Sequence, residues 1–140
     1  MNIFHSTFQQ ILFTFPNVPP EAGCILGLKN GIISELFFDA GTPRYDAGIY
    51  TPNVHVLNQT IADWTPQGIR FCGFAHSHPT EQKDLSTNDI AYIRIIMNAM
   101  PKSVKSLYFP LVFPGKEIIS FVATRTDNEI VIMPDNITII

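Results

Sequence analysis

The feature that most constrains this chain is a pair of apolar segments joined by a short polar turn. The segments cover residues 23–28 and 31–40, and Lys29-Asn30-Gly31 forms the junction between them. Asparagine and glycine both tolerate positive φ, so an Asn-Gly pair between apolar runs favours a tight β-hairpin. The sequence therefore predicts two antiparallel strands in the first third of the chain.

Three other segments have the apolar spacing that is typical of amphipathic helices. The first covers residues 6–15 and ends before Pro16, the second begins near Thr51, and the third covers residues 86–100 and ends before Pro101. Proline cannot continue a helix because it lacks the backbone N–H, so these boundaries agree with the apolar pattern. We expect three helices.

The remaining apolar segments have the aromatic and β-branched composition of strands. They are residues 69–78, 106–113, 118–124 and 129–133. Strands mixed with helices predict an α/β sandwich, in which a central mixed β-sheet is flanked by helices. We expect the core to include three aromatic residues, Trp64, Phe71 and Phe74.

Size and composition narrow the class of protein. The chain has 140 residues, of which 46% are hydrophobic, which is enough for one core and predicts a single domain over residues 1–140. The net charge is −3 and no basic block occurs, so nucleic acid is not expected as a partner. No apolar run reaches the roughly 20 residues of a membrane helix, and the N-terminal sequence does not resemble a secretory signal. We expect a cytoplasmic protein in which Cys24 and Cys72 are buried free thiols.

The chemistry of the chain is concentrated at the end of the segment 69–78. Side chains alternate along a strand, so His76 and His78 should project from the same face and reach one ion. Zinc accepts neutral imidazole and carboxylate ligands, and a catalytic zinc site keeps three protein ligands and one open position. The sequence therefore predicts two of the three protein ligands of a metal site here.

The third ligand that we predict is Asp89, in the first turn of the following helix. An acid there also interacts favourably with the helix dipole, so a purely structural role is the alternative. Ser86 lies three residues earlier, where it can cap the helix or direct a hydroxyl toward the metal. Beside a zinc ion, that hydroxyl could stabilise an oxyanion. A hydrolase also needs a carboxylate that transfers protons, and Glu21 and Glu35 are the candidates in the first half of the chain.

These residues together resemble a known motif. His76-Ser77-His78-Pro79 followed by Ser86 and Asp89 resembles the JAMM motif, H-x-H-x7-S-x2-D, of the MPN-domain metallopeptidases, also called JAB domains. The segment 20–27 resembles the upstream glutamate segment of that family, which implies that Glu21 is the general acid/base. The resemblance further implies a cytidine-deaminase-like fold and zinc-dependent hydrolysis of a peptide or isopeptide bond at the C-terminal tail of a ubiquitin-like or sulfur-carrier protein.

Two alternatives to this function stay open. One is a non-catalytic MPN-type module that binds other proteins as a scaffold, and the other is a zinc hydrolase that acts on small peptides. The sequence does not indicate an oligomeric state. His5 and His55 lie outside any spacing suited to the site, and we expect them in surface or core positions. The apolar residues 137–140 could add an edge strand or contact a partner.

Overall fold

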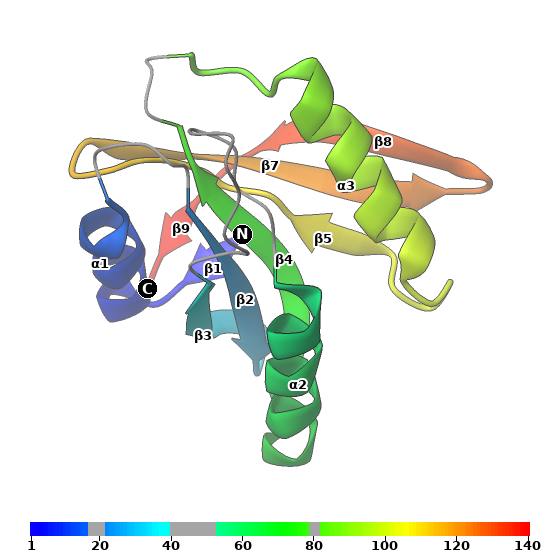
Figure 1. Ribbon diagram of the computed structural model, residues 1–140, viewed down its shortest axis with the longest axis horizontal. Helices are drawn as coiled ribbons and strands as arrows, with labels where there is room; N and C mark the ends of the chain where they lie inside the picture. The colour runs from blue at the N-terminus through cyan, green and yellow to red at the C-terminus, as the bar shows by residue number, and fades with distance from the viewer. Residues whose placement is uncertain (17–21, 40–52, 79–81) are drawn as a thin grey trace.

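The computed structural model describes residues 1–16, 22–39, 53–78 and 82–140. Within these ranges it contains three α-helices and a short 3-10 turn: α1 (His5–Thr14), α2 (Val54–Trp64), η1 (Thr65–Gln67) and α3 (Thr87–Ala99). The strands are β1 (Asn2–Ile3), β2 (Gly23–Lys29), β3 (Ile32–Asp39), β4 (Arg70–Ser77), β5 (Ser106–Tyr108), β6 (Leu111–Phe113), β7 (Glu117–Thr126), β8 (Glu129–Asp135) and β9 (Thr138–Ile139). The mixed α/β class and the three helices agree with the sequence predictions (Figure 1). None of these helices is long and apolar enough to cross a lipid bilayer.

All of the strands belong to one mixed sheet, in which β4 is central. On one side β4 is antiparallel to β2, which is antiparallel to β3, and β1 and β9 follow by parallel pairing. On the other side β4 is parallel to both β5 and β6. β7 pairs antiparallel with these two short strands, and β8 pairs antiparallel with β7. The end of β4 that carries the histidines therefore lies inside the sheet rather than at an edge.

The predicted hairpin is confirmed. β2 and β3 are antiparallel, with Lys29 opposite Ile32 at the turn and Gly23 opposite Asp39 at the far end. Asn30 and Gly31 have φ values of 54° and 78°, the conformation that the Asn-Gly pair was expected to supply. A register shift between Gly27 and Leu28 then brings Asp39, rather than Phe38, opposite Gly23.

The prediction of one continuous strand over residues 106–113 is wrong. The segment forms two strands, β5 and β6, separated by Phe109 and Pro110. Pro110 has no N–H to donate to a neighbouring strand, so the ladder is interrupted there. Its carbonyl oxygen still accepts a hydrogen bond from the amide of His76, at 3.2 Å. The interruption therefore lies directly beside the predicted metal site.

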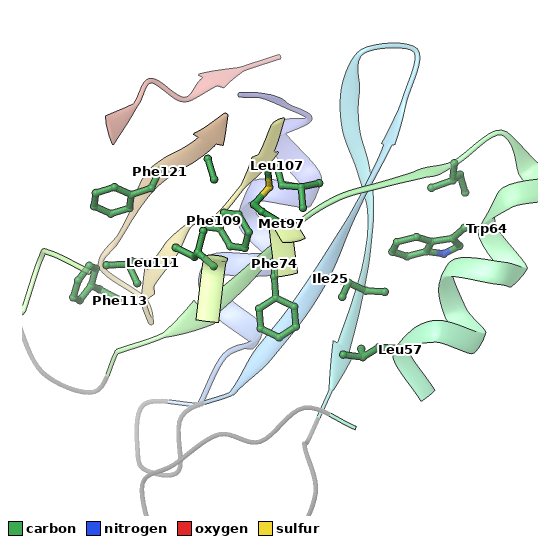
Figure 2. Close-up of a cluster of buried hydrophobic side chains, with 13 residues drawn as sticks. Ile25, Leu57, Trp64, Phe74, Met97, Leu107, Phe109, Leu111, Phe113 and Phe121 are labelled. Carbon is green, nitrogen blue, oxygen red and sulfur yellow. The ribbon is translucent and has the colours of Figure 1, made fainter. Parts of the chain in front are cut away.

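Two apolar clusters cover the two faces of the sheet. Consecutive residues of β2 belong to different clusters: Ile25 packs with the residues of α2 and α3, and Leu26 packs with those of α1. Figure 2 shows the first cluster, in which Trp64 comes from α2 and Phe74 from β4. The predicted core aromatics are in this cluster, with Trp64 and Phe74 buried and Phe71 partly buried. The helices α2 and α3 therefore lie on the opposite face from α1.

The second cluster contains both cysteines. Cys24 and Cys72 are buried as free thiols, in agreement with the sequence prediction. Burial raises the pKa of the Cys72 thiol to about 12, and the positive charge of Arg70 opposes the change. Burial also raises the pKa of Cys24, and a backbone hydrogen bond from Ala75 opposes it. Both side chains therefore act as small apolar groups in the core.

The two ends of the described chain meet at one edge of the sheet. Asn2 pairs with Thr138 and Ile3 with Ile139, so β9 extends the sheet beyond β1. Of the two roles open to residues 137–140, the edge strand is the one observed. β1 has only two residues and no sequence pattern predicted it.

Candidate metal centre

The end of β4 places both predicted histidines on one side of the sheet. His76 is the second-last residue of β4 and His78 follows its last residue. Their Nε2 atoms are 3.1 Å apart. The amide of His78 donates to the carbonyl oxygen of Val112 at 3.0 Å, as that of His76 does to Pro110. The backbone of both histidines is therefore fixed by the segment that contains β6.

The N-terminus of α3 supplies the carboxylate. Ser86 is the N-cap residue: its Oγ accepts a hydrogen bond from the amide of Asp89 at 3.1 Å. In return, the amide of Ser86 donates to Oδ2 of Asp89 at 2.8 Å. This reciprocal arrangement is a capping box, and it satisfies two backbone N–H groups at the start of the helix. The predicted capping role of Ser86 is confirmed, and the same bonds orient Asp89.

The three predicted ligands meet between β4 and α3. Oδ1 of Asp89 lies 3.1 Å from Nε2 of His76, and Oδ2 lies 3.2 Å from Nε2 of His78. The exposed fraction of the side chain is 14% for His76, 6% for His78 and 15% for Asp89, so solvent reaches the group mainly along His76 and Asp89. Their ligand atoms are close enough to hold one metal ion.

Hydrogen bonding determines which atoms of the group are available as ligands. Nδ1 of His78 lies 3.2 Å from the carbonyl oxygen of Gln82. A carbonyl oxygen can only accept, so Nδ1 carries the proton, and the lone pair of a neutral ring is left on Nε2. Burial alone would raise the pKa of Asp89, but the two imidazoles beside it and the backbone amide of Ser86 outweigh the effect of burial and hold that pKa well below its usual range. The carboxylate is therefore ionised at neutral pH.

The group fits a metal cation better than it fits three side chains alone. Atoms that carry lone pairs repel one another at about 3 Å unless a proton or a cation lies between them. Four ligands arranged tetrahedrally at about 2.0–2.1 Å from an ion are about 3.3 Å from each other, and the nitrogen and oxygen atoms here are 3.1–3.2 Å apart. Two imidazoles and one carboxylate are also a ligand set that transition metals accept.

The two candidate proton-transfer residues are Glu21 and Glu35. Glu21 lies outside the described residues. Its neighbour Ala22 is held at the end of β4 by two hydrogen bonds of 3.0 Å, from its amide to Oγ of Ser77 and from the amide of Ser77 to its carbonyl oxygen. Glu35 is exposed and pairs with Gly27, four residues along β2 from Gly23, the partner of His76. At the rise of a strand this is about 13 Å, so Glu35 is too far from the histidines to act.

Two residues near the site were not predicted. Asp39 and His76 are both paired with Gly23, on either side of β2, so their side chains lie on the same face of the sheet. Asp39 is 7% exposed, and its Oδ2 accepts a hydrogen bond from the amide of Asn53 at 2.9 Å. Tyr92 lies one helical turn after Asp89. An acid that ends an apolar strand was a signal for Asp39, but its position opposite His76 depends on strand order.

The other two histidines of the chain are away from this group. His5 and His55 are exposed, in α1 and α2. Nε2 of His5 is 3.4 Å from Nε2 of Gln9, one turn along the same helix. Their surface positions agree with the sequence prediction.

Comparisons with known proteins support the fold alone. No protein-family model and no curated protein matches the sequence. One similar solution structure is that of a protein from Desulfitobacterium hafniense, with a TM-score of 0.66 and 12% sequence identity. The match covers 99% of this chain and 91% of that chain. Another is the solution structure of a protein from Salinibacter ruber, with a TM-score of 0.58 and 19% sequence identity. This match covers 98% of this chain and 90% of that chain. The fold and the side-chain group together describe a mixed α/β protein whose His-His-Asp group could hold a metal ion.

Proposed function

We propose that this protein is a zinc-dependent metallopeptidase of the JAMM type. The observation that carries the proposal is the convergence of His76, His78 and Asp89, which the spacing H-x-H-x7-S-x2-D anticipated and whose atoms lie 3.1–3.2 Å apart. Zinc is the metal that best suits two neutral imidazoles and a carboxylate in a four-coordinate site. The hydrogen bond from His78 to Gln82 would hold the ring in the orientation that ligation needs.

Each residue of the site has a distinct role in hydrolysis. When bound, zinc would lower the pKa of a water molecule toward about 7 and polarise the carbonyl group of the substrate. Glu21 accepts the proton of the attacking water and then donates it to the departing amine. Ser86 donates its hydroxyl hydrogen to the oxyanion that forms on the carbonyl oxygen. The hydroxyl can do so because its bond with the amide of Asp89 uses a lone pair and leaves the hydrogen available.

The position of Ala22 supports the role of Glu21. Ala22 makes two hydrogen bonds with Ser77, the residue between the two histidines. Ala22, the residue that directly follows Glu21 in the sequence, therefore lies next to this end of β4. Glu35 has no comparable support, because its register places it toward the other end of the strand.

The substrate in this proposal is the C-terminal tail of a ubiquitin-like or sulfur-carrier protein, and the bond is a peptide or isopeptide bond. This part rests on the resemblance to the JAMM family. An extended tail could add to a sheet edge through main-chain hydrogen bonds. The free thiols of Cys24 and Cys72 fit the reducing cytoplasm in which we place the protein.

Metal analysis is the first test. Purified protein should carry about one zinc per chain, and a chelator should remove it. A chain without stoichiometric zinc would favour the scaffold alternative and contradict the proposal. The His78→Ala variant should lose the metal, whereas His55→Ala, which changes an exposed histidine on α2, should retain it.

Cleavage is the second test. A ubiquitin-like or sulfur-carrier protein fused through its tail to a reporter should be cut by the zinc-loaded protein and should stay intact after chelation. Glu21→Gln should abolish cleavage with the zinc content unchanged, and Glu35→Gln is the matched control that should cleave normally. Cleavage that persists in Glu21→Gln would exclude Glu21 as the base. Cleavage of short peptides but not of fusions would favour the small-peptide hydrolase.

A further inference from the structure

An aromatic pair lies next to the metal-binding group. Tyr92 is three residues after Asp89 on α3, and Phe74 is two residues before His76 on β4, so each shares the face of its neighbouring ligand. The two rings meet edge to face with their centroids 6.2 Å apart. Tyr92 is nonetheless 36% exposed. Its ring is therefore held in place while part of the side chain stays accessible to a ligand.

A buried carboxylate on the neighbouring strand β3, Asp39, acts on Tyr92 through its charge. Burial raises the pKa of Tyr92, and the negative charge of Asp39 raises it further. The phenol therefore keeps its proton at neutral pH and can donate a hydrogen bond. Asp39 is fixed by the amide of Asn53, the N-cap residue of α2. The carboxylate thus has a defined position on β3.

The register of the sheet shows where Asp39 lies relative to the candidate metal ligands. Asp39 on β3 and His76 on β4 are both paired with Gly23 on β2, which carries no side chain. Tyr92 contacts Phe74 on β4, two residues before His76, so its ring lies on the face of the sheet that carries His76 and Asp39. His76 and Asp89, the ligand neighbours of Phe74 and Tyr92 on β4 and α3, are themselves partly exposed. A molecule that binds at the exposed part of Asp89 lies within one helical turn of Tyr92.

We propose that Tyr92 positions the substrate by hydrogen-bonding a main-chain amide group next to the bond that is cut, and that Asp39 orients its hydroxyl. The inference rests on the proposed peptidase function. An extended peptide offers a main-chain N–H or C=O at every residue, and a hydroxyl can both donate to and accept from such groups. Asp39 is a positioning residue here because it acts through Tyr92.

Steady-state cleavage of the fusion separates binding from chemistry. Tyr92→Phe keeps the ring that packs on Phe74 and removes only the hydroxyl. Loss of one hydrogen bond should raise KM by roughly 3- to 10-fold with kcat within about twofold. Asp39→Asn, which can still accept from Asn53, should give a similar rise, and the double variant should be less than additive. Tyr108→Phe, a partly buried tyrosine of the other cluster, is the matched control and should leave KM unchanged.

Binding supplies a readout that does not need turnover. The dissociation constant of a labelled peptide with the sequence of the fusion's tail should be measured by fluorescence polarisation on the zinc-loaded protein. Tyr92→Phe should weaken binding by the same factor, while zinc content and thermal unfolding stay unchanged. If the fusion is not cut but the peptide binds and needs the Tyr92 hydroxyl, the peptidase proposal fails and Tyr92 remains a peptide-binding residue only. An unchanged KM or dissociation constant, no peptide binding to the wild-type protein, or an equal effect of Tyr108→Phe, overturns the role of Tyr92.

Discussion

Ser86 and Asp89 cap the N-terminus of α3 through two reciprocal hydrogen bonds, of 3.1 Å and 2.8 Å, between the side chain of each and the amide of the other. The same carboxylate lies within 3.2 Å of both histidines. Because the cap fixes where the helix begins, it also fixes where Asp89 lies relative to β4. Local helix stability and the geometry of the candidate metal centre are therefore coupled in two residues.

The two roles of Ser86, capping the helix and stabilising the oxyanion, should be separable by substitution. Ser86→Ala removes both the cap and the hydroxyl, and it should lower the free energy of unfolding by about 1 kcal/mol and kcat by about 100-fold. Glycine is tolerated at an N-cap, so Ser86→Gly should cost only a few tenths of a kcal/mol while kcat falls as far as in Ser86→Ala. Urea unfolding and steady-state cleavage measure the two quantities. Equal kcat in Ser86→Gly and the wild type would rule out the oxyanion role.

Asp89→Asn should uncouple metal binding from folding. The amide oxygen of asparagine can still accept from the Ser86 amide, but the negative charge that attracts a cation is lost. At a free zinc concentration 100 times the dissociation constant, zinc should stabilise the wild-type protein by about 2.7 kcal/mol. Thermal unfolding with and without zinc should show this gain in the wild type and not in Asp89→Asn. Asp84→Asn, at an exposed acid before the same helix, should keep the gain.

The two thiols should be unreactive in the folded protein. A thiolate is the form that reacts with disulfide reagents, and burial keeps Cys72 protonated up to about pH 12. A chromogenic disulfide reagent at pH 8 should therefore titrate no thiol in the native protein and two in urea. Rapid labelling of either cysteine without denaturant would contradict the buried environment.

The same pKa changes predict a loss of stability in alkali. Below the ordinary thiol pKa of 9.0 both the folded and the unfolded chain are protonated, so the thiols add no pH dependence. Above it the unfolded chain releases protons that the folded chain retains, so the free energy of unfolding should fall as the pH rises from about 9 toward 12. Urea unfolding at pH 8, 9 and 10 measures the slope. The slope should be smaller in the Cys24→Ala/Cys72→Ala variant, and an identical slope would assign the effect to other groups.

Two glycines should respond differently to alanine. A Cβ at Gly73 would collide with the backbone carbonyl group of Tyr108 in β5, so Gly73→Ala should move β5 away from β4 and prevent stable folding. A Cβ at Gly31 meets nothing within 4 Å, but its φ of 78° is unfavourable for alanine. Gly31→Ala should therefore cost only about 1 kcal/mol. Circular dichroism and urea unfolding compare the two variants, and a native-like Gly73→Ala would disagree with the close approach of the strands.

The local features of this protein could be predicted from its sequence. The hairpin at Asn30-Gly31 follows from the φ values that those residues allow, and α3 begins within one residue of the predicted boundary because Ser86 caps it. The two histidines share a face because side chains alternate along any strand. Each of these depends on neighbours in the chain, so sequence reasoning could place His76, His78 and Asp89 together.

The tertiary structure decided what depends on strand order and register. It placed Glu35 away from the histidines, divided residues 106–113 at Pro110, and brought Asp39 opposite His76 across Gly23. These pairings join segments far apart in the chain, and many partners satisfy the same alternation of apolar and polar residues. Only the packing of the whole sheet against its helices selects one of them, and this packing places Asp39 and the Tyr92–Phe74 ring pair beside the candidate metal-binding residues that the sequence predicts.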